Sequence, residues 1–189
     1  MTRVLSLFAL LVGVSVLSAT LWAADKHEQS PVSGFRAEYL AQLDDIRDKI
    51  VSLAEAVPAE KYAWRPAEGV RSAGEVYVHL SVANYFFPTL FGVKAPEGDL
   101  REMEKTMKGK PEVLDLLKKS FSSLHDVVMK ETDADLDRKV EMFGKETTVR
   151  GVLMVLANHI HEHLGQSIAY ARANKVVPPW SAKAAESSE

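Results

Sequence analysis

Three of the chain's six histidines stand at alternate positions in the stretch NHIHEHLGQ, residues 158–166. A histidine ring can bind a metal, carry a proton near neutral pH, or lie on a helix surface without chemistry. At about 100° per residue, His159 and His163 share one face of a helix, one turn apart. His161 is rotated by roughly 200° from His159. The stretch therefore offers one pair of imidazoles on a common face and one ring elsewhere.

The pair lies on an apolar face. It continues a stripe of Val152, Val155 and Leu156, which is expected to point into the protein. His79 stands in a second apolar stripe, eighty residues before His159. Buried imidazoles need partners, and three inward rings from facing helices could converge on one divalent cation with an open coordination position. Such ligands suit zinc, nickel, copper or ferrous iron. We favour zinc or nickel.

Other interpretations of the histidines stay open. A single core histidine is more often bonded to a backbone carbonyl than to a metal, which applies to His79 taken alone. We interpret His161 as a surface residue or as support for a ligand. His125 is expected on the surface, and His27 lies in a polar segment near the amino terminus.

Few other residues suggest catalysis. Glu162 and Gln166 each lie about one helical turn from one member of the histidine pair, so either could support a ligand or assist proton transfer. The alternative for Glu162 is a solvated charge. The sequence has no Ser–His–Asp arrangement, second carboxylate pair or glycine-rich phosphate loop, and the catalytic residues are otherwise unknown. Any chemistry should therefore be centred on a metal.

Four amphipathic helices are expected to position these residues. Apolar side chains at three- and four-residue steps predict them, and Ser72 with Glu75 forms an S-x-x-E capping box at the start of the second. Thr147 or Thr148 can cap the fourth. Residues 92–110 would form a long crossover, and 138–148 a small hairpin around Gly144. The fold class is all-α, a four-helix bundle with a long crossover between its second and third helices. The predicted helices are 35–57, 72–91, 111–129 and 149–175.

Residues 1–24 read as a secretory signal peptide with cleavage near Ala23 or Ala24, because Arg3 precedes an uncharged apolar run that ends in small residues. A retained membrane anchor is the alternative. Either way the domain is expected outside the cytoplasm, periplasmic or secreted. Cleavage would leave no stable membrane span. The remaining organisation is a lead-in at 25–34, the bundle at 35–180 and a polar tail at 181–189.

Composition limits the function further. Hydrophobic residues make up 47% of the 189, enough for the core of one domain. The formal net charge is -3 and no basic run is present, which argues against a nucleic-acid partner. Cysteine is absent, so neither a disulfide nor a lipid anchor on cysteine is available.

Two long segments resemble a known family. YAWRPAEGVRSAGEVYVHLSVANYFF and NHIHEHLGQSIAYARANKVVPPWS look like the DinB/YfiT-like superfamily, four-helix bundles with a three-histidine metal site. The family pattern has one histidine in the second helix and N-H-x-x-x-H-x-G-Q in the fourth. The resemblance, which covers about residues 35–180, implies that His79, His159 and His163 are metal ligands. His161 falls on a variable position of the motif.

The resemblance says less about activity. Some relatives are thiol transferases or isomerases, and others are described as metal-dependent hydrolases. We therefore expect an exported, metal-dependent enzyme of hydrolase or thiol-transferase type that acts on a small molecule. The signal peptide departs from the many cytoplasmic relatives and disfavours a cytosolic thiol cofactor. The alternative is a non-catalytic envelope protein that binds metal or interacts with a partner, and whose metal is structural. Relatives often pair, so a homodimer is also expected, with YFFPTLFG as either interface or core.

Overall fold

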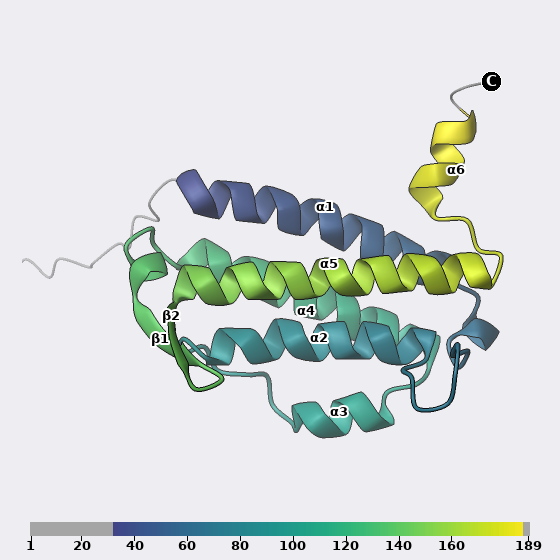
Figure 1. Cartoon of the computed structure of the whole chain (residues 1–189), viewed down its shortest axis with the longest axis horizontal. Helices are drawn as coiled ribbons and strands as arrows, with labels where there is room; N and C mark the ends of the chain where they lie inside the picture. Colours follow the sequence, from purple (N-terminus) through teal and green to yellow (C-terminus); the bar gives the residue numbers. More distant parts are fainter. Residues whose placement is uncertain (1–31, 187–189) are drawn as a thin grey trace, which may run out of the picture.

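The structure is a computed structural model that describes residues 32–186 (Figure 1). The predicted signal peptide at 1–24, most of the lead-in and residues 187–189 lie outside the described residues. Long helices dominate the described part and confirm the predicted four-helix bundle. They are α1 (Gly34–Ala56), α2 (Ala73–Thr89), α4 (Lys110–Lys130) and α5 (Val149–Ala173).

The order of the helices around the bundle differs from their order along the chain. Helix α1 packs against α4 and α5, and α2 packs against the same two helices. In Figure 1, α5 runs between α1 and α2, with α4 behind them. This arrangement makes α2 and α5 neighbours although a whole helix and two long connections separate them in sequence. The helices that carry the three inward histidines are therefore adjacent.

The start of α2 is strongly specified by local contacts. The Ser72 hydroxyl accepts a hydrogen bond from the Glu75 backbone at 3.3 Å, and the Glu75 carboxylate accepts one from the Ser72 backbone at 2.8 Å. This is the predicted capping box. The connector from α1, with its 3-10 turn η1 (Ala59–Lys61), packs so closely here that a Cβ on Gly74 would lie 3.0 Å from the Tyr62 ring. Pro88 lies in the last turn of α2, which ends one residue later.

The two remaining connections carry short elements. The crossover between α2 and α4 contains α3 (Leu100–Thr106), which the Asp99 side chain caps and which packs against α2. After α4, the 3-10 turn η2 (Asp135–Asp137) leads into the predicted hairpin. Its strands β1 (Lys139–Met142) and β2 (Lys145–Thr148) are antiparallel, with Met142 opposite Lys145. Thr148 then caps α5.

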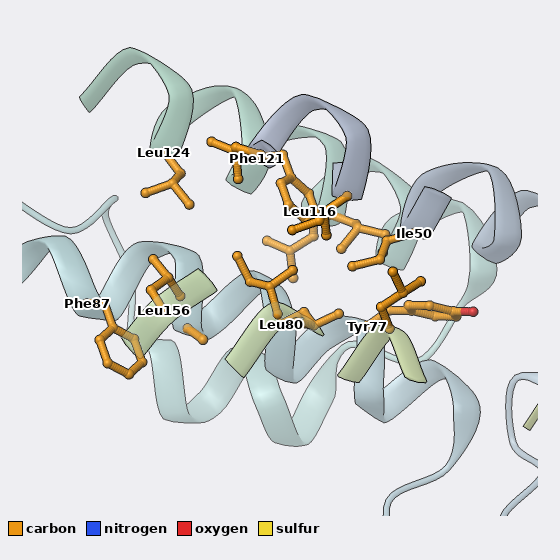
Figure 2. Close-up of a cluster of buried hydrophobic side chains, with 14 of the residues drawn as sticks. Ile50, Tyr77, Leu80, Phe87, Leu116, Phe121, Leu124 and Leu156 are labelled. Atoms are coloured by element: carbon orange, nitrogen blue, oxygen red, sulfur yellow. The ribbon is translucent and has the colours of Figure 1, made fainter. Parts of the chain in front are cut away.

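All four long helices contribute to one apolar core (Figure 2). Ile50 of α1, Leu80 of α2, Phe121 of α4 and Leu156 of α5 are all buried almost completely. Truncating one such leucine to alanine typically costs about 2–5 kcal/mol, because the cavity that remains does not fully collapse. The core thus packs α2 against α5.

One element lies beyond the predicted helices. We expected a polar tail at residues 181–189, and the first part of this segment belongs to the short helix α6 (Pro179–Glu186), which contacts α1. Pro179, its first residue, suits the first helical turn, where the missing N–H has no intrahelical partner to lose. Among residues 32–186, none of the helices has the length and apolar character needed to cross a bilayer.

Candidate metal centre

Three imidazole rings meet between α2 and α5. His79 comes from α2, and His159 and His163 come from successive turns of α5. Their ring centroids are separated by 5.1 Å (His79–His159), 5.0 Å (His79–His163) and 4.5 Å (His159–His163). One ring nitrogen from each residue lies within 4.8 Å of the other two. Nitrogens at such separations can approach a single cation together.

The other histidines of the described residues lie elsewhere. His161 is exposed, and its Nδ1 lies 2.9 Å from the Ala157 carbonyl on its own helix. His125 is partly exposed on α4 beside Asp126. The helical rotation that separates His161 from the pair is therefore present in the structure. His27 lies outside the described residues.

The environment of His159 suits a bound cation. Its Nε2 atom is buried and makes no hydrogen bond among the residues described by the structure. Burial, together with nearby His163 and His79, lowers the pKa of His159 to about 4, so the ring is neutral at physiological pH. A buried polar atom without a partner costs about 1–3 kcal/mol. A divalent cation at this nitrogen would remove that penalty.

Glu104 of α3 contacts the Nδ1 atom of His79. This Nδ1 lies 2.8 Å from the Glu104 carboxylate, which also accepts a hydrogen bond from Arg71 at 2.8 Å. Burial and nearby Arg71 lower the pKa of His79, although the carboxylate acts in the other direction. Burial alone would raise the pKa of Glu104, but the hydrogen bonds from Arg71 and His79 lower it overall. The carboxylate thus favours a hydrogen on Nδ1, which leaves Nε2 as the nitrogen that can bind a metal.

His163 is supported in a similar way. Its Nδ1 lies 2.7 Å from the Gln166 side-chain oxygen, and the Gln166 amide donates a hydrogen bond to the Tyr170 hydroxyl at 2.9 Å. Tyr170 in turn packs edge-on against Trp64, with ring centroids 5.3 Å apart. Gln166 therefore contacts the histidine one turn away, as its spacing suggested. That it supports a metal ligand stays a prediction.

A cavity of about 610 Å³ opens beside the histidines, between α2, α5 and the tip of the hairpin. Glu162 lines it and is exposed, and within residues 32–186 its carboxylate makes no hydrogen bond or ion pair. The other lining residues are largely apolar and come from all three elements. They are Val82, Ala83, Phe86, Phe87, Phe143 and Val155, with Asn158, His79 and His159 as further polar residues.

Sequence reasoning missed three residues near the site. Glu104 and Arg71 belong to connecting segments that show little periodic pattern in the sequence. No motif with a fixed spacing relates either residue to His79. Phe143 lies in a turn that the sequence indicated only through Gly144. One local signal was available for the crossover, because Asp99 is a good N-cap residue just before α3.

Comparison with known proteins relates this arrangement to solved structures. The uncharacterised protein YjoA of Bacillus subtilis strain 168 is 25% identical over 124 residues, which are 64% of this chain and 78% of YjoA. A DinB-like protein from Bacillus cereus ATCC 10987 superposes with a TM-score of 0.69 at 21% identity, covering 76% of this chain and 95% of that one. The structure of YjoA superposes with a TM-score of 0.61 at 23% identity, covering 74% of this chain and 93% of YjoA.

YfiT from Bacillus subtilis is similar in fold, with a TM-score of 0.60 at 14% identity over 75% of this chain and 89% of YfiT. YfiT is described as a probable metal-dependent hydrolase with an unusual four-helix bundle topology. The model of the DinB superfamily matches residues 42–167, which include the three clustered histidines. This chain therefore belongs to the DinB superfamily.

Proposed function

We propose that the chain is a metal-dependent hydrolase of small molecules that binds a divalent cation through His79, His159 and His163. The observation that carries the proposal is the buried, unpartnered Nε2 of His159 within a three-histidine cluster at the edge of a cavity. Zinc or nickel is the proposed metal, because neutral imidazoles suit both. A cation in this position would act as a Lewis acid on an oxygen or sulfur of the substrate.

The surrounding residues have separable roles in this proposal. Glu104 and Gln166 hold the Nδ1 atoms of two ligands, which fixes the ring orientations. Glu162 would accept the proton from the attacking nucleophile, because its carboxylate lines the cavity and makes no hydrogen bond or ion pair within the described part of the chain. The apolar walls would restrict water beside the reacting group.

Hydrolysis is favoured over thiol transfer by the chain's composition and its predicted location. The chain contains no cysteine, so a thiol nucleophile would have to come from a second small molecule. Hydrolysis requires only water, which is available in any compartment. Thiol transfer is the second reaction that should be tested.

A structural role for the metal is the alternative function. The three rings come from α2 and α5 in a chain without disulfides, so a cation bound to them would link the two helices and stabilise the folded state. Under this alternative the protein would bind metal or a partner outside the cytoplasm without turnover. Two measurements separate the functions.

The first measurement is the metal content of protein purified without a histidine tag. We expect about one divalent ion per chain, as a single site of three ligands and one open position implies. The His159→Ala variant should lose the ion. His161→Ala is the matched control, because it removes an exposed imidazole from the same helix and should keep the ion. Absence of metal from the wild type, or full retention by His159→Ala, would rule the metal site out.

The second measurement is turnover with ester, amide, phosphoester and thiol-transfer substrate panels, with and without chelator. We expect chelator to abolish hydrolysis, and Glu162→Gln to lower kcat by roughly 10²–10⁴-fold, the usual contribution of a proton-transferring group. The variant should keep its metal. If chelator lowers the melting temperature while no panel shows turnover, the structural alternative holds instead.

We also propose that the mature protein is exported. The support is the pattern of residues 1–24, in which Arg3 precedes an uncharged apolar run. Cell fractionation with amino-terminal sequencing tests this. Export predicts a mature chain in the periplasm or medium that begins near Asp25. A full-length chain in the membrane fraction would instead support a retained anchor.

A further inference from the structure

Phe143 occupies a position where phenylalanine is unfavourable in two ways. It is the first of two turn residues between β1 and β2, with φ of 51°, and Gly144 follows with φ of 78°. Two-residue turns of this kind favour Asn-Gly or Asp-Gly, because bulky side chains rarely adopt left-handed backbone. The residue is also 70% exposed. Unfavourable local features of this kind cluster at functional sites.

The ring of Phe143 is aligned with other aromatic rings of the cavity. It stacks on Phe86 with centroids 6.3 Å apart and an interplanar angle of 17°, and it meets Phe87 edge-on at 6.2 Å. The ring centroids of Phe87 and His159 are 6.0 Å apart. We call Phe86, Phe87 and Phe143 the aromatic wall. The wall extends from the hairpin tip to the histidine cluster.

The size of the cavity limits what could bind there. Its volume of about 610 Å³ suits a small organic molecule. His79 and Phe86 lie two turns apart on α2, about 10 Å along the helix axis. A ligand of that length could place a polar group at the histidines and an apolar ring against the aromatic wall.

We propose that the aromatic wall binds an aryl group of the substrate, while the substrate's reacting polar group lies at His79 and His159. An aryl ring is favoured over an alkyl chain because the wall offers ring faces and edges, which aromatic groups pack against with offset-stacked or edge-to-face geometry. The position of the reacting group rests on the proposed function. The aryl site itself depends only on the aromatic wall.

The first test compares two metal-binding probes that differ in one group. Benzohydroxamate and acetohydroxamate are titrated into metal-loaded protein by calorimetry. Benzohydroxamate should bind roughly tenfold or more tightly, because burial of the phenyl ring adds to the same coordinating head. Phe143→Ala and Phe86→Ala should reduce the ratio of the two affinities and leave the affinity for acetohydroxamate unchanged. Met154→Ala, which truncates an exposed apolar residue of α5 that does not line the cavity, is the control.

The second test needs no metal. Binding of 4-fluorobenzyl alcohol to chelator-treated wild type is followed by broadening of its fluorine resonance, which should be lost in Phe143→Ala and kept in Met154→Ala. Phe143→Asn should also lose binding but raise the melting temperature by roughly 2–4 °C, because asparagine tolerates the left-handed turn. A gain in stability near 1 kcal/mol shifts the melting temperature by about that amount in a domain of this size. This variant separates loss of the site from loss of the fold.

The outcomes distinguish the aryl site from the proposed function. Equal affinity for the two hydroxamates, or a ratio that Phe143→Ala does not change, would overturn the aryl site even if metal is present. Binding of 4-fluorobenzyl alcohol that depends on Phe143 would support the aryl site by itself. If the wild type also holds no metal as purified and binds none when zinc or nickel is added, the aryl site stands and the proposed function falls.

Discussion

Glu104 and His79 are joined by a 2.8 Å hydrogen bond, although the carboxylate lies on a separate short helix 25 residues further along the chain. Arg71 forms an ion pair with the same carboxylate oxygen. This ion pair restrains the Glu104 carboxylate, which orients the His79 ring. The crossover between α2 and α4 therefore contributes to the candidate metal centre. It does so without supplying any of the clustered histidines.

Replacing Glu104 should weaken metal binding. Glu104→Ala removes the acceptor for Nδ1 of His79, and loss of such a supporting group typically lowers metal affinity by about 10–100-fold. Glu104→Gln keeps an acceptor and should recover part of the affinity. Competition with a chromophoric chelator measures the effect. Glu102→Ala on the same helix is the control, because its carboxylate pairs with Lys105 away from the site. Equal affinities of Glu104→Ala and Glu102→Ala would contradict the role.

Gln166 should support His163 in the same manner. Gln166→Leu removes the acceptor 2.7 Å from Nδ1, so the affinity for metal should fall by a factor within about 10–100. Gln166→Glu restores an acceptor and should bind more tightly than Gln166→Leu. Tyr170→Phe removes only the hydroxyl that accepts from Gln166, and its effect should be smaller. The same chelator competition ranks the three variants, and wild-type affinity in Gln166→Leu would exclude this role.

The pairing of His159 and His163 was predictable because it depends only on helical rotation, which fixes which side chains share a face. The helices themselves were predictable from apolar spacing and from the Ser72 capping box. Approach of His79 to the pair depends in addition on the packing of α2 against α5. The spacing of residues along the chain does not show which helices pack together. The family resemblance is what indicated that His79 joins the pair.

The supporting residues could not be predicted in the same way. Arg71 and Glu104 meet across 33 residues, between a connector and a helix of seven residues with no buried side chain. Without an apolar face, α3 leaves little periodic pattern in the sequence. Phe143 reaches the cavity through the geometry of a two-residue turn, which aims its ring toward Phe86. Such contacts depend on tertiary packing and on turn conformation together.

The capping box should make stability depend on pH in the acid range. The hydrogen bond from the Ser72 backbone, with further support from Arg65, lowers the pKa of Glu75 below its usual value of 4.5. A carboxylate whose pKa is lower in the folded state stabilises the fold above its unfolded pKa. That stability is lost as the pH falls through the folded pKa. The wild type should therefore lose this contribution below about pH 4.5, the ordinary value from which the shift starts.

Glu75→Gln tests this expectation, because the amide can still cap the helix but cannot ionise. Urea unfolding at several pH values should show the wild type more stable at pH 7, with the difference shrinking as the pH falls below about 4.5. Glu68→Gln, at an exposed position in the same connector, controls for loss of one negative charge. A difference between wild type and Glu75→Gln that stays constant down to pH 3 would argue against the ionised cap.

His159→Leu should have opposite effects on stability with and without metal. Without metal, the variant should be at least as stable as the wild type, because it removes a buried nitrogen that has no hydrogen-bond partner in the described residues. With metal at about 100 times its Kd, the wild type should gain about 2.7 kcal/mol and the variant should not. Urea unfolding with chelator and with added zinc or nickel measures both states, and His161→Leu serves as the control. An equal gain from metal in wild type and His159→Leu would show that the ion binds elsewhere.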